Sequence, residues 1–258
     1  MKTTIIIPAR YASTRFPGKP LQILKASDGT EKTLVQRSWE AAMAVKGGHD
    51  VVVATDDKRI ADCVRSFGGE VIMTDANCAN GTERCADALR QIKDRPELIV
   101  NLQGDAPMTP PWFVEELIAS MRADPNVDAA TPVLRCDTET LGHFLEDRRN
   151  DRVGGTTAVF THDGRALYFS KEVIPFVPDR ALLPCPVFHH VGVYAYRPDV
   201  LEQYANWQEG PLEANEGLEQ LRFLENGRVM KCVEVDAKGR MFWELNNPED
   251  ISRIEGAL

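Results

Sequence analysis

The sequence predicts an α/β protein: a three-layer sandwich with a mostly parallel, Rossmann-like sheet and a smaller mixed lobe. Short apolar runs alternate with helical patterns in the first half of the chain, which is the order of a parallel sheet covered on both faces. Strand signals become denser after residue 125, and 258 residues suffice for one large domain with a smaller lobe. We therefore expect an α/β part over residues 1–125 and an integral mixed lobe over residues 126–258.

Four apolar runs predict the parallel strands of the first part, at residues 3–8, 51–54, 71–73 and 98–100. The helices that follow them carry apolar residues at helical spacing, namely Val35, Trp39, Ala42 and Met43; Ile60, Ala61, Val64 and Phe67; Cys85, Leu89 and Ile92; and Phe113, Val114, Leu117 and Met121. Asp56 and Thr82 are the expected N-caps of the second and third helices.

The second half of the chain has a different pattern. Strands are predicted at residues 129–134, 156–161, 166–170 and 189–196, and a loop over residues 136–155. Helices return at residues 212–225 and 248–257. These segments predict the mixed lobe and the helices that close the chain.

Composition excludes several classes of function. A net charge of −9 argues against non-specific binding of nucleic acid. No apolar run reaches the roughly 20 residues of a membrane span, and the first residues read as a strand, so we expect a cytoplasmic protein with no membrane partner. The six cysteines form no C-x-x-C pair, which favours free thiols over a zinc site.

The loop after the first strand, residues 8–20, carries three cations: Arg10, Arg15 and Lys19. In an open parallel sheet, ligands bind beyond the carboxyl ends of the strands, so these cations suit the phosphates of a nucleotide. The loop is not a Walker A motif, because Pro20 follows Lys19 where that motif needs Ser or Thr.

Two further loops reach the same edge of the predicted sheet. Gly81 and Thr82 precede the third helix, and Asn101 and Gln103 supply amides able to read the edge of a base. Asp105 supplies a carboxylate for a metal ion. Together with the cations of the first loop, this set indicates nucleotide chemistry with a bound metal.

Motifs in order along nearly the whole chain carry a family resemblance. The first is Ile7-Pro8-Ala9-Arg10-Tyr11-Ala12-Ser13-Thr14-Arg15-Phe16-Pro17-Gly18-Lys19-Pro20-Leu21. Others are Gly81-Thr82-Glu83-Arg84, Val100-Asn101-Leu102-Gln103-Gly104-Asp105, Ala166-Leu167-Tyr168-Phe169-Ser170, His190-Val191-Gly192-Val193-Tyr194, Pro211-Leu212-Glu213 and Leu218-Glu219-Gln220-Leu221-Arg222. They resemble the CMP-Kdo synthetase family, the 3-deoxy-manno-octulosonate cytidylyltransferases, which have the nucleotide-diphospho-sugar transferase type of fold.

The resemblance implies an activity and partners. CMP would pass from CTP to the anomeric hydroxyl of Kdo or a related ulosonic acid, with release of pyrophosphate and with Mg²⁺ as cofactor. It also implies a homodimer that activates a precursor of lipopolysaccharide or capsule. Residues 1–125 would then bind the nucleotide, and residues 126–258 would bind the sugar and form the dimer.

The resemblance also assigns roles to residues of this sequence. The catalytic residues would be Arg10, Lys19 and Asp105. The nucleotide would contact Pro8, Ala9, Arg10, Arg15, Lys19, Thr55, Gly81, Thr82, Asn101 and Gln103. The sugar would contact Tyr168, Ser170, His190, Tyr194, Glu213 and Gln220, and the metal ligands would be Asp105 and Asn246.

One departure from the family pattern concerns the metal. Asn246 stands where the family carries a second metal aspartate. An amide oxygen can ligate Mg²⁺ but brings no charge, so we expect weaker metal binding, or a metal held mainly by Asp105 and CTP. Asn247 is expected to begin the last helix, with Asp250 reaching back to it.

Other departures fall in the sugar half. Thr157 replaces a lysine that relatives usually carry, and Lys171 and His189 replace arginines. Kdo, an amino-sugar analogue of it and another ulosonic acid therefore all stay open as acceptors. Two further hypotheses are a nucleotidyltransferase for a different sugar acid or sugar phosphate, and a catalytically weak relative that binds CTP.

Overall fold

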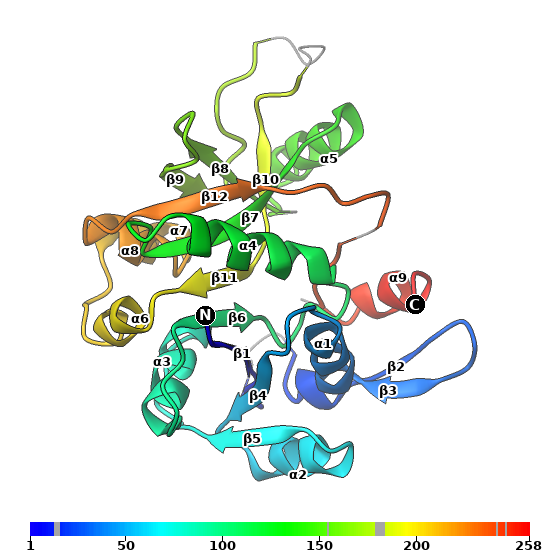
Figure 1. The fold of residues 1–258 in the computed structure, drawn as a ribbon. Helices are drawn as coiled ribbons and strands as arrows, with labels where there is room; N and C mark the ends of the chain where they lie inside the picture. The colour runs from blue at the N-terminus through cyan, green and yellow to red at the C-terminus, as the bar shows by residue number, and fades with distance from the viewer. Residues whose placement is uncertain (13–15, 154, 179–183, 241, 246) are drawn as a thin grey trace. The chain divides into compact units, whose positions relative to one another are not determined.

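A computed structural model describes all residues of the chain except 13–15, 154, 179–183, 241 and 246. The described part forms two compact units, each assembled from separate stretches of sequence (Figure 1). The first unit comprises Met1–Glu115, Ala195–Ala205 and Ala237–Leu258, and the second comprises Glu116–Tyr194 and Asn206–Asp236. The functional division that we expected, into residues 1–125 and 126–258, stays a prediction.

The first unit contains the parallel strands that the apolar runs predict. They follow the order β5-β4-β1-β6 and have the bounds β1 (Thr3–Pro8), β4 (Asp50–Thr55), β5 (Glu70–Met73) and β6 (Leu98–Leu102). In this register Ile6 lies opposite Val52 on one side and Asn101 on the other. Every residue of β1 is buried, as expected of a central parallel strand.

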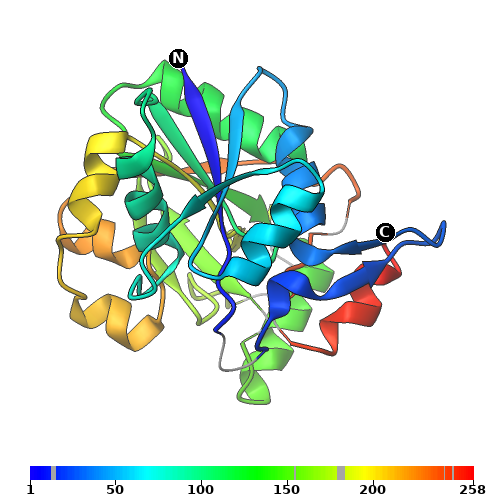
Figure 2. The same ribbon diagram turned by 90° about the horizontal axis from the view of Figure 1, so that it is seen from below.

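Helices cover both faces of this sheet. Figures 1 and 2 show α1 and α2 on one face and α3 on the other. The bounds confirm the predicted helices: α1 (Leu34–Met43), α2 (Lys58–Ser66), α3 (Gly81–Gln91) and α4 (Pro111–Ala123).

Two predicted caps are wrong by one or two residues. Asp57, not Asp56, accepts the backbone hydrogen bond of Arg59 at 2.8 Å, and Asn80, not Thr82, accepts that of Glu83 at 2.8 Å. Asp56 instead forms an ion pair with a buried arginine. Several capping residue types stand next to one another in each loop, and sequence alone did not choose between them.

Smaller elements surround the first unit. They are η1 (Lys19–Leu21), β2 (Ile23–Lys25), β3 (Glu31–Thr33), α6 (Pro198–Tyr204) and α9 (Asp250–Glu255). The β2–β3 hairpin and α6 were not predicted, whereas α9 confirms the last helix. The cap predicted at Asn247 is wrong, because Glu249 is the N-cap of α9; Asp250 Oδ2 does accept a hydrogen bond from the Asn247 backbone at 2.7 Å, as expected.

The second unit holds the strands of the mixed lobe. The antiparallel order is β7-β10-β8-β9, and β12 pairs with β7 in parallel. The bounds are β7 (Ala129–Arg135), β8 (Thr156–Phe160), β9 (Ala166–Ser170), β10 (Phe188–His190) and β12 (Met230–Glu234). The strand expected over residues 189–196 is divided into β10 and β11 (Val193–Tyr196), with a tight turn in which Val193 N donates to Val191 O at 2.7 Å.

The helices of the second unit correct two predictions. The loop expected over residues 136–155 is wrong, because α5 (Thr138–Arg149) lies there with Asp137 as its N-cap. Only Leu141 and Phe144 of α5 are buried, so its apolar face was too narrow to recognise. The helix expected over residues 212–225 is broken into α7 (Pro211–Glu216) and α8 (Leu221–Glu225) at Gly217, whose φ of 61° is left-handed.

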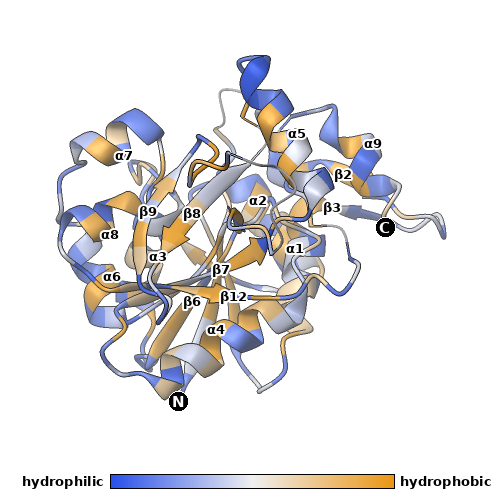
Figure 3. Cartoon of the chain, turned by 90° about the horizontal axis from the view of Figure 1, so that it is seen from above, coloured by the Kyte–Doolittle hydropathy of each residue, from blue (hydrophilic) through white to orange (hydrophobic). Residues whose placement is uncertain are grey.

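Hydrophobic residues are frequent on the strands of the sheet, and hydrophilic residues are frequent on the helices (Figure 3). The six cysteines are free, as predicted. Every described helix is too short or too polar to traverse a lipid bilayer.

One polar core group of the second unit titrates abnormally. His190 is 5% exposed, and its burial lowers the pKa of the imidazole to about 3. The unfolded chain binds a proton near pH 6.5, so below that pH the unfolded state holds more protons than the folded state. Protonation therefore opposes folding as the pH falls.

We expect the free energy of unfolding to fall by about 2 kcal/mol between pH 7 and pH 5 through His190 alone. Urea unfolding at both pH values measures this loss, which His190→Gln should reduce by that amount. His162→Gln, in an exposed turn, is the control and should keep the full pH dependence. Equal pH dependence in His190→Gln and the wild type would contradict the assignment.

Candidate active site

A cation and a carboxylate from two predicted loops meet in the first unit. Lys19 Nζ lies 2.6 Å from Asp105 Oδ2, and the side chains are 16% and 25% exposed. Lys19 begins η1 directly after Gly18, whose φ of 71° is left-handed. The structure thus brings together two of the three predicted catalytic residues.

The turn after β6 fixes the place of Asp105. A Cβ at Gly104 would lie 2.7 Å from the carbonyl oxygen of Pro8, so only glycine allows this approach of the two backbones. The Gly104 carbonyl accepts a hydrogen bond from Ser38 Oγ at 3.0 Å, and the Asp105 carbonyl accepts one from Leu245 N at 2.8 Å. Asp105 therefore stands on a backbone that is held on several sides.

The predicted base-reading residues gather beside this turn. A Cβ at Gly81 would lie 3.3 Å from Gln103 Oε1 and 3.4 Å from Pro8 Cγ, so these three residues are neighbours. Gly81 is the first residue of α3, whose N-terminal N–H groups favour negative charge. An amide, a proline ring and a helix N-terminus therefore share one corner of the sheet edge.

Asn101, near the end of β6, is fully buried. Neither atom of its amide finds a hydrogen-bond partner among the described residues. A buried amide without a partner is costly, and native structures contain few of them. This favours the predicted role in ligand binding over a role in packing alone.

The remaining predicted nucleotide residues have partners within the first unit. Arg10 is exposed, and its Nη1 donates to the carbonyl of Ala79 at 3.3 Å. The Thr55 hydroxyl accepts a hydrogen bond from Asp57 N at 3.2 Å, and Thr82 Oγ1 lies 3.3 Å from Tyr196 Oη. Ala9 N donates to Ala54 O at 2.9 Å. Arg15 lies outside the described residues, and the nucleotide roles of the others stay predictions.

Arg84, which the sequence places in a motif at this sheet edge without a structural role, is a structural residue of the first unit. It is 3% exposed, pairs with Asp56 Oδ1 at 3.1 Å and donates to Thr74 Oγ1 at 2.5 Å. A single buried arginine therefore ties α3 to the loops after β4 and β5. Its position in the Gly81-Thr82-Glu83-Arg84 motif was the only sequence signal, and the motif does not give the partners.

The donor set for a divalent cation is small. Within the described ranges, no group of three or more His, Cys, Asp or Glu side chains stands together as a metal site. Mg²⁺ commonly takes one or two carboxylates and completes its shell with water and substrate phosphates, so the Asp105 carboxylate fits as a ligand. Asn246 lies outside the described residues, and its role stays a prediction.

In the second unit, two predicted sugar residues converge on a residue that was not predicted, Glu216. Its Oε1 accepts a hydrogen bond from Ser170 Oγ at 2.7 Å and lies 3.4 Å from Tyr168 Oη, and its Oε2 accepts one from Lys171 N at 2.8 Å. Burial, and then the Glu216 carboxylate, raise the pKa of Tyr168 above its usual value. The only signal for Glu216 was its position one helical turn after Glu213.

Three other predicted sugar residues form a buried network. Tyr194 Oη donates to Gln220 Oε1 at 3.3 Å, and Gln220 Nε2 lies 3.5 Å from His190 Nδ1. Glu213 lies apart in a buried ion pair, where Arg222 Nε and Nη2 donate to its carboxylate at 2.5 and 2.8 Å. The structure thus groups Tyr194, Gln220 and His190, and gives Glu213 a structural partner.

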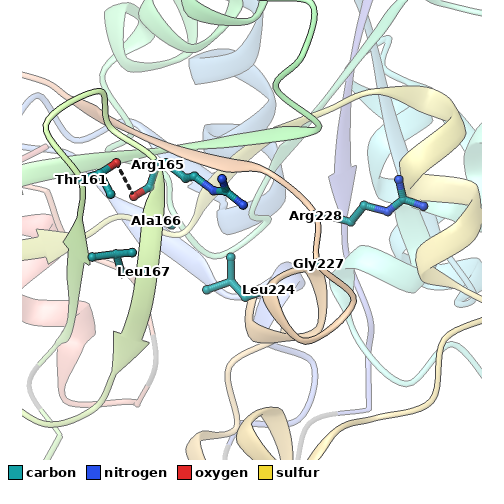
Figure 4. Close-up of a pocket in the computed structure, with 7 residues that line it drawn as sticks. All are labelled: Thr161, Arg165, Ala166, Leu167, Leu224, Gly227 and Arg228. Carbon is teal, nitrogen blue, oxygen red and sulfur yellow. Dashed lines mark hydrogen bonds between the residues drawn. The ribbon is translucent and has the colours of Figure 1, made fainter.

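A separate cavity of about 300 Å³ lies in the second unit (Figure 4). It is lined by Thr161, Arg165, Ala166, Leu167, Leu224, Gly227 and Arg228. None of these described lining residues is among the predicted site residues, so this cavity is not the predicted sugar site.

The profile of the family described as "Cytidylyltransferase" matches residues 4–234. The chain is 44% identical to the 3-deoxy-manno-octulosonate cytidylyltransferase of Maricaulis maris (strain MCS10), over 100% of this chain and 97% of the relative. It is 40% identical to the 8-amino-3,8-dideoxy-manno-octulosonate cytidylyltransferase of Shewanella amazonensis (strain ATCC BAA-1098 / SB2B), over 100% and 99%.

A solved structure of CMP:2-keto-3-deoxy-manno-octonic acid synthetase complexed with CTP has a TM-score of 0.84 to this fold. It is 33% identical, with 99% of this chain and 98% of that chain covered. The likeness confirms the fold class, and the comparisons together confirm the resemblance found in the motifs. The chain belongs to the cytidylyltransferase family.

Proposed function

We propose that this protein transfers CMP from CTP to the anomeric hydroxyl of Kdo or a closely related ulosonic acid and releases pyrophosphate. The observation that carries this proposal is the contact of Lys19 with Asp105 at the edge of the parallel sheet. A cation at that edge suits a phosphate group, and a carboxylate there suits the metal ion that accompanies it. The end-to-end likeness to Kdo cytidylyltransferases supports the acceptor class.

Positioning and charge neutralisation account for most catalysis of nucleotidyl transfer, because the protein has little covalent chemistry to perform. Lys19, Arg10 and Arg15 would bind the triphosphate, and the Gln103 amide beside Gly81 would orient the base. Asp105 would hold Mg²⁺, which when bound polarises a phosphoryl oxygen and lowers the pKa of a coordinated hydroxyl. Because Lys19 contacts the Asp105 carboxylate directly, the ammonium would turn to the phosphates once the metal binds.

The acceptor would bind to the second unit, at the side chains around Glu216 and Gln220. An 8-amino analogue of Kdo is a second candidate acceptor, because a relative named for that substrate is 40% identical over the whole chain. Ulosonic acids are preferred to phosphorylated sugars as acceptors, because both of the relatives compared are named for octulosonates.

We also propose a homodimer in the cytoplasm that prepares a precursor of lipopolysaccharide or capsule. Phe176, a large apolar side chain of the second unit that is 87% exposed, is the residue at which a contact between two copies can be tested. Sedimentation of the wild type and of Phe176→Ser would show whether this side chain contributes to self-association.

The function itself is tested by pyrophosphate release from CTP. We expect release only when Mg²⁺ and an ulosonic acid are both present, and turnover of Kdo and its 8-amino analogue should be compared with that of sugar 1-phosphates. Turnover of sugar 1-phosphates alone would contradict the proposed acceptor class.

Asn246→Asp should tighten Mg²⁺ binding by about tenfold, because it adds a carboxylate at the proposed metal site.

Loss of either charge of the pair should reduce kcat strongly. We expect Lys19→Met and Asp105→Asn each to lower kcat by about 100-fold or more, since each removes a preorganised electrostatic group. Lys32→Met, which breaks the surface pair with Glu40, is the matched control and should leave kcat unchanged. Near-normal activity in Lys19→Met or Asp105→Asn would overturn their catalytic assignment.

Glu216→Gln should raise the KM for the acceptor by about tenfold and leave the KM for CTP unchanged. The amide has one acceptor oxygen where the carboxylate receives donors on both oxygens, so Ser170 or Lys171 N would face an N–H group. Steady-state kinetics with each substrate varied in turn measure the change. Glu209→Gln, at an exposed position of the same unit, is the control, and an equal effect of both variants would count against the assignment.

A further inference from the structure

His190 sits among hydroxyl groups that determine which of its ring nitrogens carries the proton. Nε2 lies 3.1 Å from Thr131 Oγ1, and Nδ1 lies 3.0 Å from Thr156 Oγ1. The imidazole is 5% exposed and stacks edge-on near Phe169. Burial lowers its pKa to about 3, so at neutral pH the ring is uncharged and one nitrogen donates while the other accepts.

Thr131 decides which nitrogen donates. Its hydroxyl has a single hydrogen, and it lies 3.0 Å from the carbonyl oxygen of Val191 and 2.9 Å from that of Val193. Carbonyl oxygens only accept, so the hydroxyl hydrogen is directed to them and a lone pair of Oγ1 faces His190. A lone pair at 3.1 Å requires a donor, and therefore Nε2 carries the proton.

The opposite nitrogen then fixes the orientation of Gln220. With Nε2 protonated, Nδ1 is an acceptor, and it faces the Thr156 hydroxyl and Gln220 Nε2. The amide oxygen of Gln220 is thereby turned to the hydroxyl of Tyr194, from which it accepts a hydrogen bond at 3.3 Å. The opposite tautomer would place an N–H group against the amide N–H groups.

We propose that Thr131 is a positioning residue: it holds His190 in the Nε2–H tautomer and so sets the direction of the Gln220 amide. The consequence for the acceptor sugar rests on the proposed function, in which Gln220 contacts that sugar. The hydrogen bonds themselves do not rest on it, because all of them lie within the described residues of the second unit.

The tautomer is measured directly by NMR of protein with ¹⁵N-labelled histidine, since protonated and unprotonated ring nitrogens resonate far apart. His190→Gln identifies the signals. We expect the Nε2–H form in the wild type and in Thr131→Ser, which keeps the hydroxyl, and the Nδ1–H form in Thr131→Val. The Nδ1–H form in the wild type, or an unchanged tautomer in Thr131→Val, would overturn the proposal.

Kinetics separate positioning from stability. Thr131→Val should raise the KM for the acceptor by about 3- to 10-fold, with the KM for CTP unchanged and with recovery in Thr131→Ser. If Thr131→Val does not fold, Thr156→Val replaces it, and retention of the Nε2–H form there supports the assignment while its loss overturns it. A confirmed tautomer in a protein without transferase activity would refute the proposed function and leave the tautomer assignment standing.

Discussion

The ion pair of Lys19 with Asp105 is the contact on which the proposed chemistry depends. It exists because β1 and β6 are parallel neighbours, so the loops that follow them leave the sheet at the same edge. Gly104 permits the second loop to pass against Pro8, and this close approach presents Asp105 beside Lys19. The strand order and the close packing at Gly104 are topological and steric constraints, and the contact between Lys19 and Asp105 follows from them.

The second unit relies on a different kind of interaction. Its grouped polar side chains are buried and mostly neutral, and they are matched donor to acceptor, with the charge of Glu216 balanced by hydroxyl and backbone donors. The charged pair of the first unit would suit the triphosphate proposed, and the hydrogen-bonding groups of the second unit would suit the hydroxyl groups of the proposed acceptor. A polyphosphate is bound through its charge, whereas a sugar is distinguished through the directions of its hydroxyl groups.

The sequence was sufficient for the parallel strands and for the loops that meet at their ends, because both follow from local periodicity and from a general rule of open sheets. The sequence was insufficient wherever contacts with residues distant along the chain determine a secondary-structure element or the role of a side chain. Helix α5 buries only two of its residues, and β2 and β3 together bury only Leu24. None of the three elements therefore has a hydrophobic periodicity that the sequence could reveal. Thr131 and Glu216 were missed because their roles exist only through the side chains they meet.

Two of the departures from the family pattern are neighbours across one pair of strands. Thr157 and His189, which replace a lysine and an arginine of relatives, are Cα partners across the β8–β10 ladder. The Thr157 hydroxyl donates to Glu172 O at 2.6 Å and lies 3.3 Å from Ile174 N, and burial lowers the pKa of His189 to about 4. Neither residue therefore brings a charge at neutral pH. The two positions thus form one uncharged cross-strand pair in the second unit, and a side chain substituted at either position would face the other.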